Sequence, residues 1–309
     1  PAPAAAAPKF RARRPRRRAR STGARARVGL HGARTQARAE RPRCGGLTVV
    51  GWAAAAGLYV LPDLHAAPGG QTGINHDDGP GYPLMFYVPR DRDLTVKLWQ
   101  AIAQRYAGNP TILGYDLLNE PIAPYHDVAT LNPRLEPFFK RVTEAIRAVD
   151  PGRIVFLAAG QWSSSFDMFG PPFAPNLAYT YHSFWASTKR DSIQRHLNFS
   201  TRYDVPLFLG ETGELTDDWN EGFRKLHETH DIGWSFWTYK NLDSPSTVVS
   251  IPRPEGWNEI VAYADGLRPD RPSNGLITKA MQQYLSGMPV KNATVRWSYL
   301  ASLGLKDAP

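Results

Sequence analysis

Short apolar runs alternate with longer amphipathic stretches along most of this 309-residue chain. Six runs are almost continuously hydrophobic, as expected for β-strands that are buried on both faces. They are residues 57–65, 113–120, 154–159, 177–184, 206–211 and 234–239. The alternation starts near Thr48 and predicts a parallel sheet whose strands are joined by crossover helices.

The stretches between the runs carry apolar residues at helical spacing. In the first of them, Leu94, Leu98 and Ile102 recur at four-residue steps, and Gly108 follows as a stop signal. The expected helices are residues 91–107, 137–149, 189–203, 217–229 and 275–285. No glycine-rich phosphate-binding motif follows any strand, which argues against a nucleotide-binding sheet. The pattern favours an α/β fold of the TIM-type (β/α) barrel, with its active site at the carboxyl ends of the strands.

The first 47 residues differ in composition from the rest of the chain. They hold 13 arginines and Lys9 against the single acid Glu40, so they account for the overall net charge of +9. With almost no periodic apolar pattern, residues 1–47 are expected to be a disordered or non-native basic leader. An arm that binds nucleic acid is the alternative, but Phe10 is the only aromatic residue among the arginines. Residues 48–309 are expected to form the catalytic domain.

Several classes of protein and site are excluded by simple features. Cys44 is the only cysteine, which excludes an intramolecular disulfide and a multi-cysteine metal site. The longest apolar run, residues 49–62, is shorter than the roughly 20 residues that a membrane-spanning helix needs. No signal peptide is visible at the start. His227 and His230 are three residues apart, whereas a zinc-protease motif needs four, so they are expected on a solvated helix face.

Polar and aromatic side chains stand at the carboxyl ends of the predicted strands. Glu120, within Asn119-Glu120-Pro121, follows one strand, and Glu211 ends a later one. In a barrel they would face each other across the opening, and paired carboxyl groups are what glycoside cleavage requires. Glu214 is a rival for Glu211, but it lies beyond the strand end and is expected in a loop.

These residues in this order resemble family 5 glycoside hydrolases, the cellulase-type retaining enzymes with a (β/α)8 barrel. The resemblance covers about residues 48–285 and implies that Glu120 is the acid/base and Glu211 the nucleophile. It also implies a set of substrate-binding residues. These are His65, Asn119, His182 and Trp237 around one sugar, with Trp162 and Trp185 as stacking platforms for further sugars.

The resemblance implies a retaining hydrolase of β-linked glucan that needs no metal or organic cofactor. An endo-β-1,4-glucanase is expected, with an exo-β-1,3-glucanase or a β-mannanase as alternatives. The expected partner is a β-glucan oligosaccharide or polysaccharide, with no nucleic acid and no membrane, and the expected location is extracellular or periplasmic. An alternative of another class is a weak or inactive sugar-binding remnant.

The chain departs from the family in two places. Phe184 stands where the family has a tyrosine that holds the nucleophile, so that bond is expected to be missing or supplied by a neighbour such as Tyr181. About six of eight strands are identifiable and the first two are lacking, so an incomplete barrel is expected, behind an N-terminus that is replaced or out of frame. An open sheet edge of this kind predicts self-association.

Overall fold

A seven-stranded sheet forms the centre of the molecule, and every neighbouring pair of strands in it is parallel. The computed structural model describes residues 26–30, 45–74, 77 and 79–305. The strands lie side by side in chain order. They are β1 (Ala26–Leu30), β2 (Val60–Leu64), β3 (Gly114–Asp116), β4 (Ile154–Ala158), β5 (Leu177–His182), β6 (Leu207–Glu211) and β7 (Gly233–Trp234).

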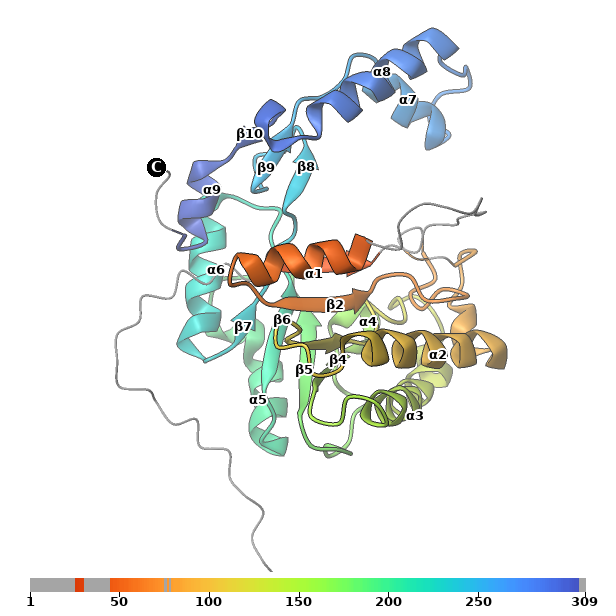
Figure 1. Cartoon of the computed structure of the whole chain (residues 1–309), viewed down its shortest axis with the longest axis vertical. Helices are drawn as coiled ribbons and strands as arrows, with labels where there is room; N and C mark the ends of the chain where they lie inside the picture. Colours follow the sequence, from red (N-terminus) through yellow and green to blue (C-terminus); the bar gives the residue numbers. More distant parts are fainter. Residues whose placement is uncertain (1–25, 31–44, 75–76, 78, 306–309) are drawn as a thin grey trace, which may run out of the picture.

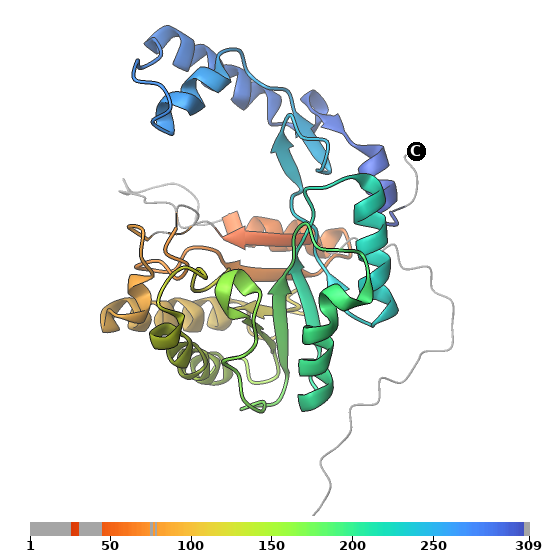
Figure 2. The ribbon, with the colours of Figure 1, turned by 180° about the vertical axis from the view of Figure 1, so that it is seen from behind.

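Helices connect successive strands and cover the outer side of the curved sheet (Figures 1 and 2). They are α1 (Gly45–Ala55), η1 (Leu84–Phe86), α2 (Pro89–Tyr106), α3 (Val128–Arg147), α4 (Gly160–Ser163), η2 (Arg190–Ile193), α5 (Gln194–Tyr203) and α6 (Asp217–Thr229). Each of the six predicted strands overlaps an observed one, although β7 shares only Trp234 with the predicted residues 234–239. Within the described residues β1 and β7 are the unjoined edges of the sheet. The predicted incomplete (β/α) barrel is therefore confirmed.

One strand of the sheet comes from the basic leader. Residues Ala26–Leu30 form β1 and pair with β2 in register from Ala26↔Val60 to Leu30↔Leu64. The expectation that residues 1–47 lack regular structure is wrong for these five residues and for residues 45–47, which begin α1. The edge of β2 offers unpaired backbone groups, and a short segment without proline can hydrogen-bond to them. Residues 1–25 and 31–44, the other parts of the leader before α1, lie outside the described residues.

Helix α3 starts earlier than its apolar pattern predicts. The predicted helix spans residues 137–149, whereas α3 begins at Val128. The side chain of Asp127 caps the helix by accepting a hydrogen bond from the backbone N–H of Thr130 (3.1 Å). Pro133 and Pro137 lie inside the helix on its exposed face. The early start went unrecognised because prolines inside a helix are normally disfavoured.

The core has two layers that follow the alternation of side chains along the strands. The larger cluster packs the sheet against the outer helices; in it Trp99 of α2 is fully buried and donates to the carbonyl of Leu117 (3.0 Å). The smaller cluster lies on the other face of the sheet and consists of Leu61, Phe156, Ala178 and Phe208. Its aromatic rings, Phe156 and Phe208, meet edge to face with centroids 5.4 Å apart. The sheet is thereby fixed from both sides beneath its carboxyl edge.

Residues after β7 form a smaller second unit. It contains β8 (Lys240–Leu242), β9 (Val249–Ile251), α7 (Trp257–Ala264), α8 (Asn274–Gly287), η3 (Val290–Asn292), β10 (Thr294–Val295) and α9 (Trp297–Ser302). Helices α7 and α8 extend away from the main sheet (Figure 1), and Trp257 stacks on Tyr284 between them at 5.3 Å. Among the described residues, no helix has the length and apolar character needed to cross a membrane.

Two buried histidines pack behind β5. Tyr181 of β5 stacks on His196 of α5, with ring centroids 4.0 Å apart and planes at 20°, and His227 of α6 lies on its other flank at 6.0 Å. Burial lowers the pKa of His196 to about 3, assisted by the nearby charge of Arg195, and burial lowers the pKa of His227 to about 4. His227 is fully buried with Nδ1 2.7 Å from the carbonyl oxygen of Phe223, so its expected place on a solvated face is wrong.

These histidines predict a loss of stability in mild acid. The unfolded chain takes up protons at histidine near pH 6.5, whereas the folded chain does so only near pH 3 to 4. The contribution of the two neutral histidines to the unfolding free energy is therefore complete above pH 6.5 and declines as the pH falls towards 4. At pH 5 the loss is about 2 kcal/mol per histidine. Denaturant unfolding at pH 7 and pH 5 measures it.

Two variants separate this effect from general acid sensitivity. His196→Phe keeps an aromatic ring in the stack and should reduce the difference in unfolding free energy between pH 7 and pH 5. Thr229→Ala, at an exposed position of α6 that carries no ionisable group, should leave that difference unchanged. An unaltered difference in His196→Phe would contradict the assignment.

Candidate active site

The predicted acidic pair meets at the carboxyl edge of the sheet. Glu120 stands in the turn that follows β3, and Glu211 is the last residue of β6. His182, the last residue of β5, lies beside both. Because all these strands are parallel, their carboxyl ends reach the same edge, and residues distant in the chain come together there.

His182 lies within reach of both carboxyl groups. Its Nδ1 atom lies 3.0 Å from Oε1 of Glu120 and 3.7 Å from Oε2 of Glu211. The carboxyl oxygens and the imidazole nitrogen all lie within 4.8 Å of one another. The Glu120 side chain is 15% exposed and that of Glu211 9%. The pair is therefore mostly enclosed but open to a substrate from one side.

Donor atoms at this spacing also suit a cation. Two carboxylates and one imidazole are a donor set that a divalent ion such as Zn²⁺ accepts. The same atoms are those that glycoside cleavage needs, so a metal ion bound there would compete with that chemistry.

A second group of predicted residues adjoins the acidic pair. Nδ1 of His65 lies 3.0 Å from a carboxylate oxygen of Asp63, which makes it the donor of that bond. The Nε2 atom then accepts from the side-chain amide of Asn119 at 3.3 Å. The ring of Trp237 lies nearly parallel to His65, with centroids 6.0 Å apart and planes at 13°. The structure thus brings His65, Asn119 and Trp237 together.

The loops after β5, β6 and β7 are tied together by Thr212. Its hydroxyl donates to the carbonyl of Ser183 (2.6 Å), and its own carbonyl accepts the backbone N–H of Trp237 (2.7 Å). The N–H of Ser183 in turn donates to the carbonyl of Glu211 (3.1 Å). Sequence reasoning missed Thr212, and also Asp63, Gln71 and Thr72, because their roles depend on contacts between loops rather than on a pattern along one strand.

The predicted stacking residues follow two neighbouring strands: Trp162 belongs to α4 after β4, and Trp185 to the loop after β5. Trp162 is 37% exposed and meets Tyr125 edge to face at 5.9 Å. Trp185 is 67% exposed and contacts Phe184. The rival Glu214 is an exposed loop residue, as expected.

Tyr181 does not hold the nucleophile. Its ring is fully buried against His196, on the side of the outer helices, and its hydroxyl has no hydrogen-bond partner among the described residues. The expectation that Tyr181 could replace the tyrosine missing at Phe184 is therefore wrong. The strand register shifts between Tyr181 and His182, and their contacts differ: Tyr181 packs on His196 of α5, whereas His182 lies beside the carboxyl groups.

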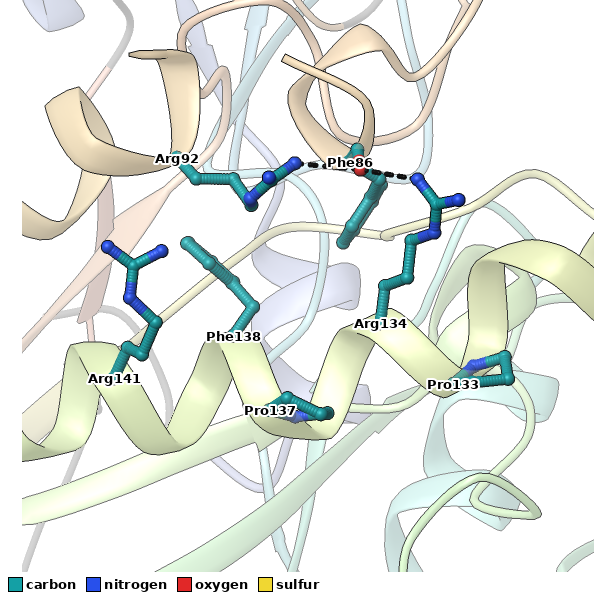
Figure 3. A pocket seen from close by; sticks show the side chains of 7 residues that line it. All are labelled: Phe86, Arg92, Pro133, Arg134, Pro137, Phe138 and Arg141. Atoms are coloured by element: carbon teal, nitrogen blue, oxygen red, sulfur yellow. Dashed lines mark hydrogen bonds between the residues drawn. The ribbon is translucent and has the colours of Figure 1, made fainter. Parts of the chain in front are cut away.

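A hollow of a different character lies on the outer surface between η1, α2 and α3 (Figure 3). It is lined by Phe86, Arg92, Pro133, Arg134, Pro137, Phe138 and Arg141. None of the candidate active-site residues lines it. Arg92 and Arg134 both donate to the carbonyl of Phe86 there, each at 2.8 Å.

Comparison with known proteins agrees with the geometry. The family model described as Cellulase (glycosyl hydrolase family 5) matches residues 47–243. A β-xylosidase from Phanerodontia chrysosporium is 30% identical in an alignment of length 223 that covers 60% of this chain and 46% of the relative. Endoglucanase Z from Dickeya dadantii is 29% identical over 146 residues, which are 47% of this chain and 32% of the relative. The chain spans about half or less of these curated relatives.

Solved structures share the fold at low sequence identity. The cellulose synthase subunit Z from Clostridioides difficile superposes with a TM-score of 0.54 at 16% identity, over 83% of this chain and 77% of that one. Endoglucanase Cel5A from Thermotoga maritima gives 0.52 at 18% identity, over 70% and 78%.

Gly213 provides a test of how the loops are held. Its φ of 132° is one that side chains rarely adopt, and a Cβ atom there would lie 2.4 Å from the carbonyl oxygen of Trp237. Gly213→Ala should therefore lower the unfolding free energy by about 1–3 kcal/mol. Gly152→Ala, where a Cβ meets nothing within 4 Å, should change it by less than about 0.5 kcal/mol. Equal values in denaturant unfolding would refute the close approach.

Proposed function

Since the chain belongs to glycosyl hydrolase family 5, the cellulase family, we propose that it is a retaining hydrolase of β-linked glucan, an endo-β-1,4-glucanase. The observation that carries this proposal is the approach of Glu120 and Glu211, whose facing oxygens lie within 4.8 Å of each other. Carboxyl groups about 5–5.5 Å apart support retention, whereas inversion needs about 6.5–9.5 Å to admit a water between them.

The reaction proceeds in two displacements on the acidic pair. Glu211 attacks the anomeric carbon while Glu120 gives its proton to the departing glycosidic oxygen, and a covalent glycosyl-enzyme forms. Glu120, now ionised, then removes a proton from water, which attacks the same carbon and releases Glu211. The acid/base role of Glu120 and the nucleophile role of Glu211 are assigned from the positions of these residues in the sequence pattern of family 5. His182, between the two, limits the directions in which they can turn.

The sugar next to the cleaved bond would rest on the second group of residues. Trp237 provides an aromatic face for the C–H surface of the ring. Asn119 would bind the 2-hydroxyl, and its amide is already oriented by the contact with His65. His65 and His182 would line the same subsite. The exposed rings of Trp162 and Trp185 are available for sugars further along a polymer, which favours action within a chain. A polymeric substrate places the protein outside the cytoplasm.

A second candidate is a sugar-binding protein with little or no turnover. The unjoined edges of the sheet favour it, because an error of about 1 Å in the placement of a catalytic group costs about 10²-fold in rate. An exo-acting β-1,3-glucanase or a β-mannanase would use the same acidic pair on a different polymer.

Hydrolysis of carboxymethylcellulose, laminarin and mannan by the full chain distinguishes these candidates. We expect the highest reducing-sugar release from carboxymethylcellulose. Glu120→Gln and Glu211→Gln should each lower it by at least about 10²-fold, because each removes a proton donor or a nucleophile. Glu214→Gln is the matched control, since it changes an exposed glutamate in the next loop, and it should retain full activity.

Retention of the configuration at the anomeric carbon is tested by a separate measurement. Proton NMR of the first product should show the β-anomer before mutarotation. Release of the α-anomer would contradict the mechanism, and turnover that survives both glutamine variants would contradict the site. Binding of the polymers without turnover would favour the sugar-binding alternative.

A further inference from the structure

The loop after β2 is bound to the turn that carries Glu120 through two fully buried residues, Gln71 and Thr72. They lie 48 residues before Asn119 and Glu120 in the chain, yet every contact described below is direct. Their contacts are with the main chain on both sides of Glu120.

Gln71 uses its whole side-chain amide in these contacts. Its Nε2 atom donates to the carbonyl of Asn119 (2.8 Å) and to that of His65 (2.9 Å). Its Oε1 atom accepts from the backbone N–H of Ala67 (2.9 Å). Both donors and the acceptor are satisfied in a site without solvent, which fixes the orientation of the amide. The main chain of His65 and that of Asn119 are thereby held by one group.

Thr72 holds the main chain of Glu120 itself. Its hydroxyl donates to the carbonyl of Glu120 at 2.7 Å. Its own carbonyl accepts the N–H of Ala123 (3.2 Å), and the carbonyl of Gln71 accepts the N–H of Ile122 (2.9 Å). Four main-chain groups between Asn119 and Ala123 are therefore bound by Gln71 and Thr72 alone.

The turn held in this way is strained. Glu120 has φ 45° and Ile122 has φ 60°, in the left-handed region that residues with side chains rarely occupy. Such conformations are unfavourable and persist only when surrounding contacts enforce them. Gln71 and Thr72 make hydrogen bonds to main-chain groups of Asn119, Glu120, Ile122 and Ala123. These hydrogen bonds hold Glu120 and Ile122 at their positive φ angles.

The loop that carries Gln71 and Thr72 is itself anchored. The N–H of Met85, near the end of the loop, donates to the carbonyl of Gly70 at 3.2 Å. Figure 3 shows Arg92 of α2 and Arg134 of α3 both directed at the carbonyl of Phe86. The loop is thus attached to the outer helices independently of Glu120, and it can serve as a fixed support.

We propose that Gln71 and Thr72 are positioning residues that hold the acid/base Glu120 in a strained turn, aimed at the bond to be cleaved. This inference rests on the proposed function of Glu120. They bind no substrate and exchange no proton. Their effect on the reaction is confined to the steps in which Glu120 gives or takes a proton.

The test compares Thr72→Val with Thr72→Ser in the full chain, using two aryl substrates. Phenyl β-cellobioside needs a proton on its departing oxygen, whereas 2,4-dinitrophenyl β-cellobioside leaves without one. Valine has the shape of threonine but no hydroxyl, so kcat/KM for the phenyl substrate should fall about 10²-fold and that for the dinitrophenyl substrate clearly less. Serine keeps the hydroxyl and should restore most of the activity.

A general structural defect would give a different result. It would lower kcat/KM for both substrates by the same factor, and that outcome overturns the proposal. A serine variant as impaired as the valine variant, or a valine variant with unchanged kinetics, overturns it as well.

Hydrogen exchange supplies a measurement that does not depend on turnover. The amides of Ile122 and Ala123 should exchange at least about tenfold faster in Thr72→Val than in the wild type, because the turn loses one of its supports. Unchanged exchange overturns the proposal whatever the kinetics. If the wild type cleaves neither aryl substrate, the proposed function fails, and exchange alone then decides whether Thr72 holds the turn.

Discussion

Two carboxyl groups of like charge stand close together at the carboxyl edge of the sheet, and the candidate chemistry depends on keeping them there. Such a pair repels when both groups are ionised, so it needs rigid support. Glu120 and Glu211 receive it from different strands, and both strands are packed on each face by apolar clusters. His182 between them then has a defined place within reach of both.

The fold was largely predictable because its strands are buried on both faces. Near-continuous apolar runs between amphipathic helices indicated a parallel sheet, and this signal is strong where no solvent-facing positions interrupt it. The apolar pattern mispredicted two elements, because each depends on local hydrogen bonds that override the average preferences of its residues. The start of α3 depends on a cap at Asp127 and tolerates prolines on an exposed face. Strand β1 forms because the edge of β2 offers hydrogen bonds, which no apolar pattern could reveal.

The site was predictable in its side chains and not in its support. Glu211 and His182 end strands, Glu120 follows one, and all three have ionisable side chains, so their types and positions pointed to them. Gln71 and Thr72 act through main-chain groups far away in the chain, and nothing along the sequence marks which carbonyl an amide will reach. Tyr181 was misjudged for a simpler reason: its ring packs on His196 of α5, whereas His182, one step along the strand, lies beside the carboxyl groups.

The order of the strands has a consequence for a sheet with unjoined edges. Because spatial order equals chain order, each strand pairs with the strands next to it along the chain, and together they form an arc. Both glutamates belong to interior members of that arc: β3 lies between β2 and β4, and β6 between β5 and β7. The relative position of the two glutamates is therefore set without any bond between β1 and β7. The barrel can stay open between these two edge strands while the carboxyl ends of β3 and β6 keep their arrangement.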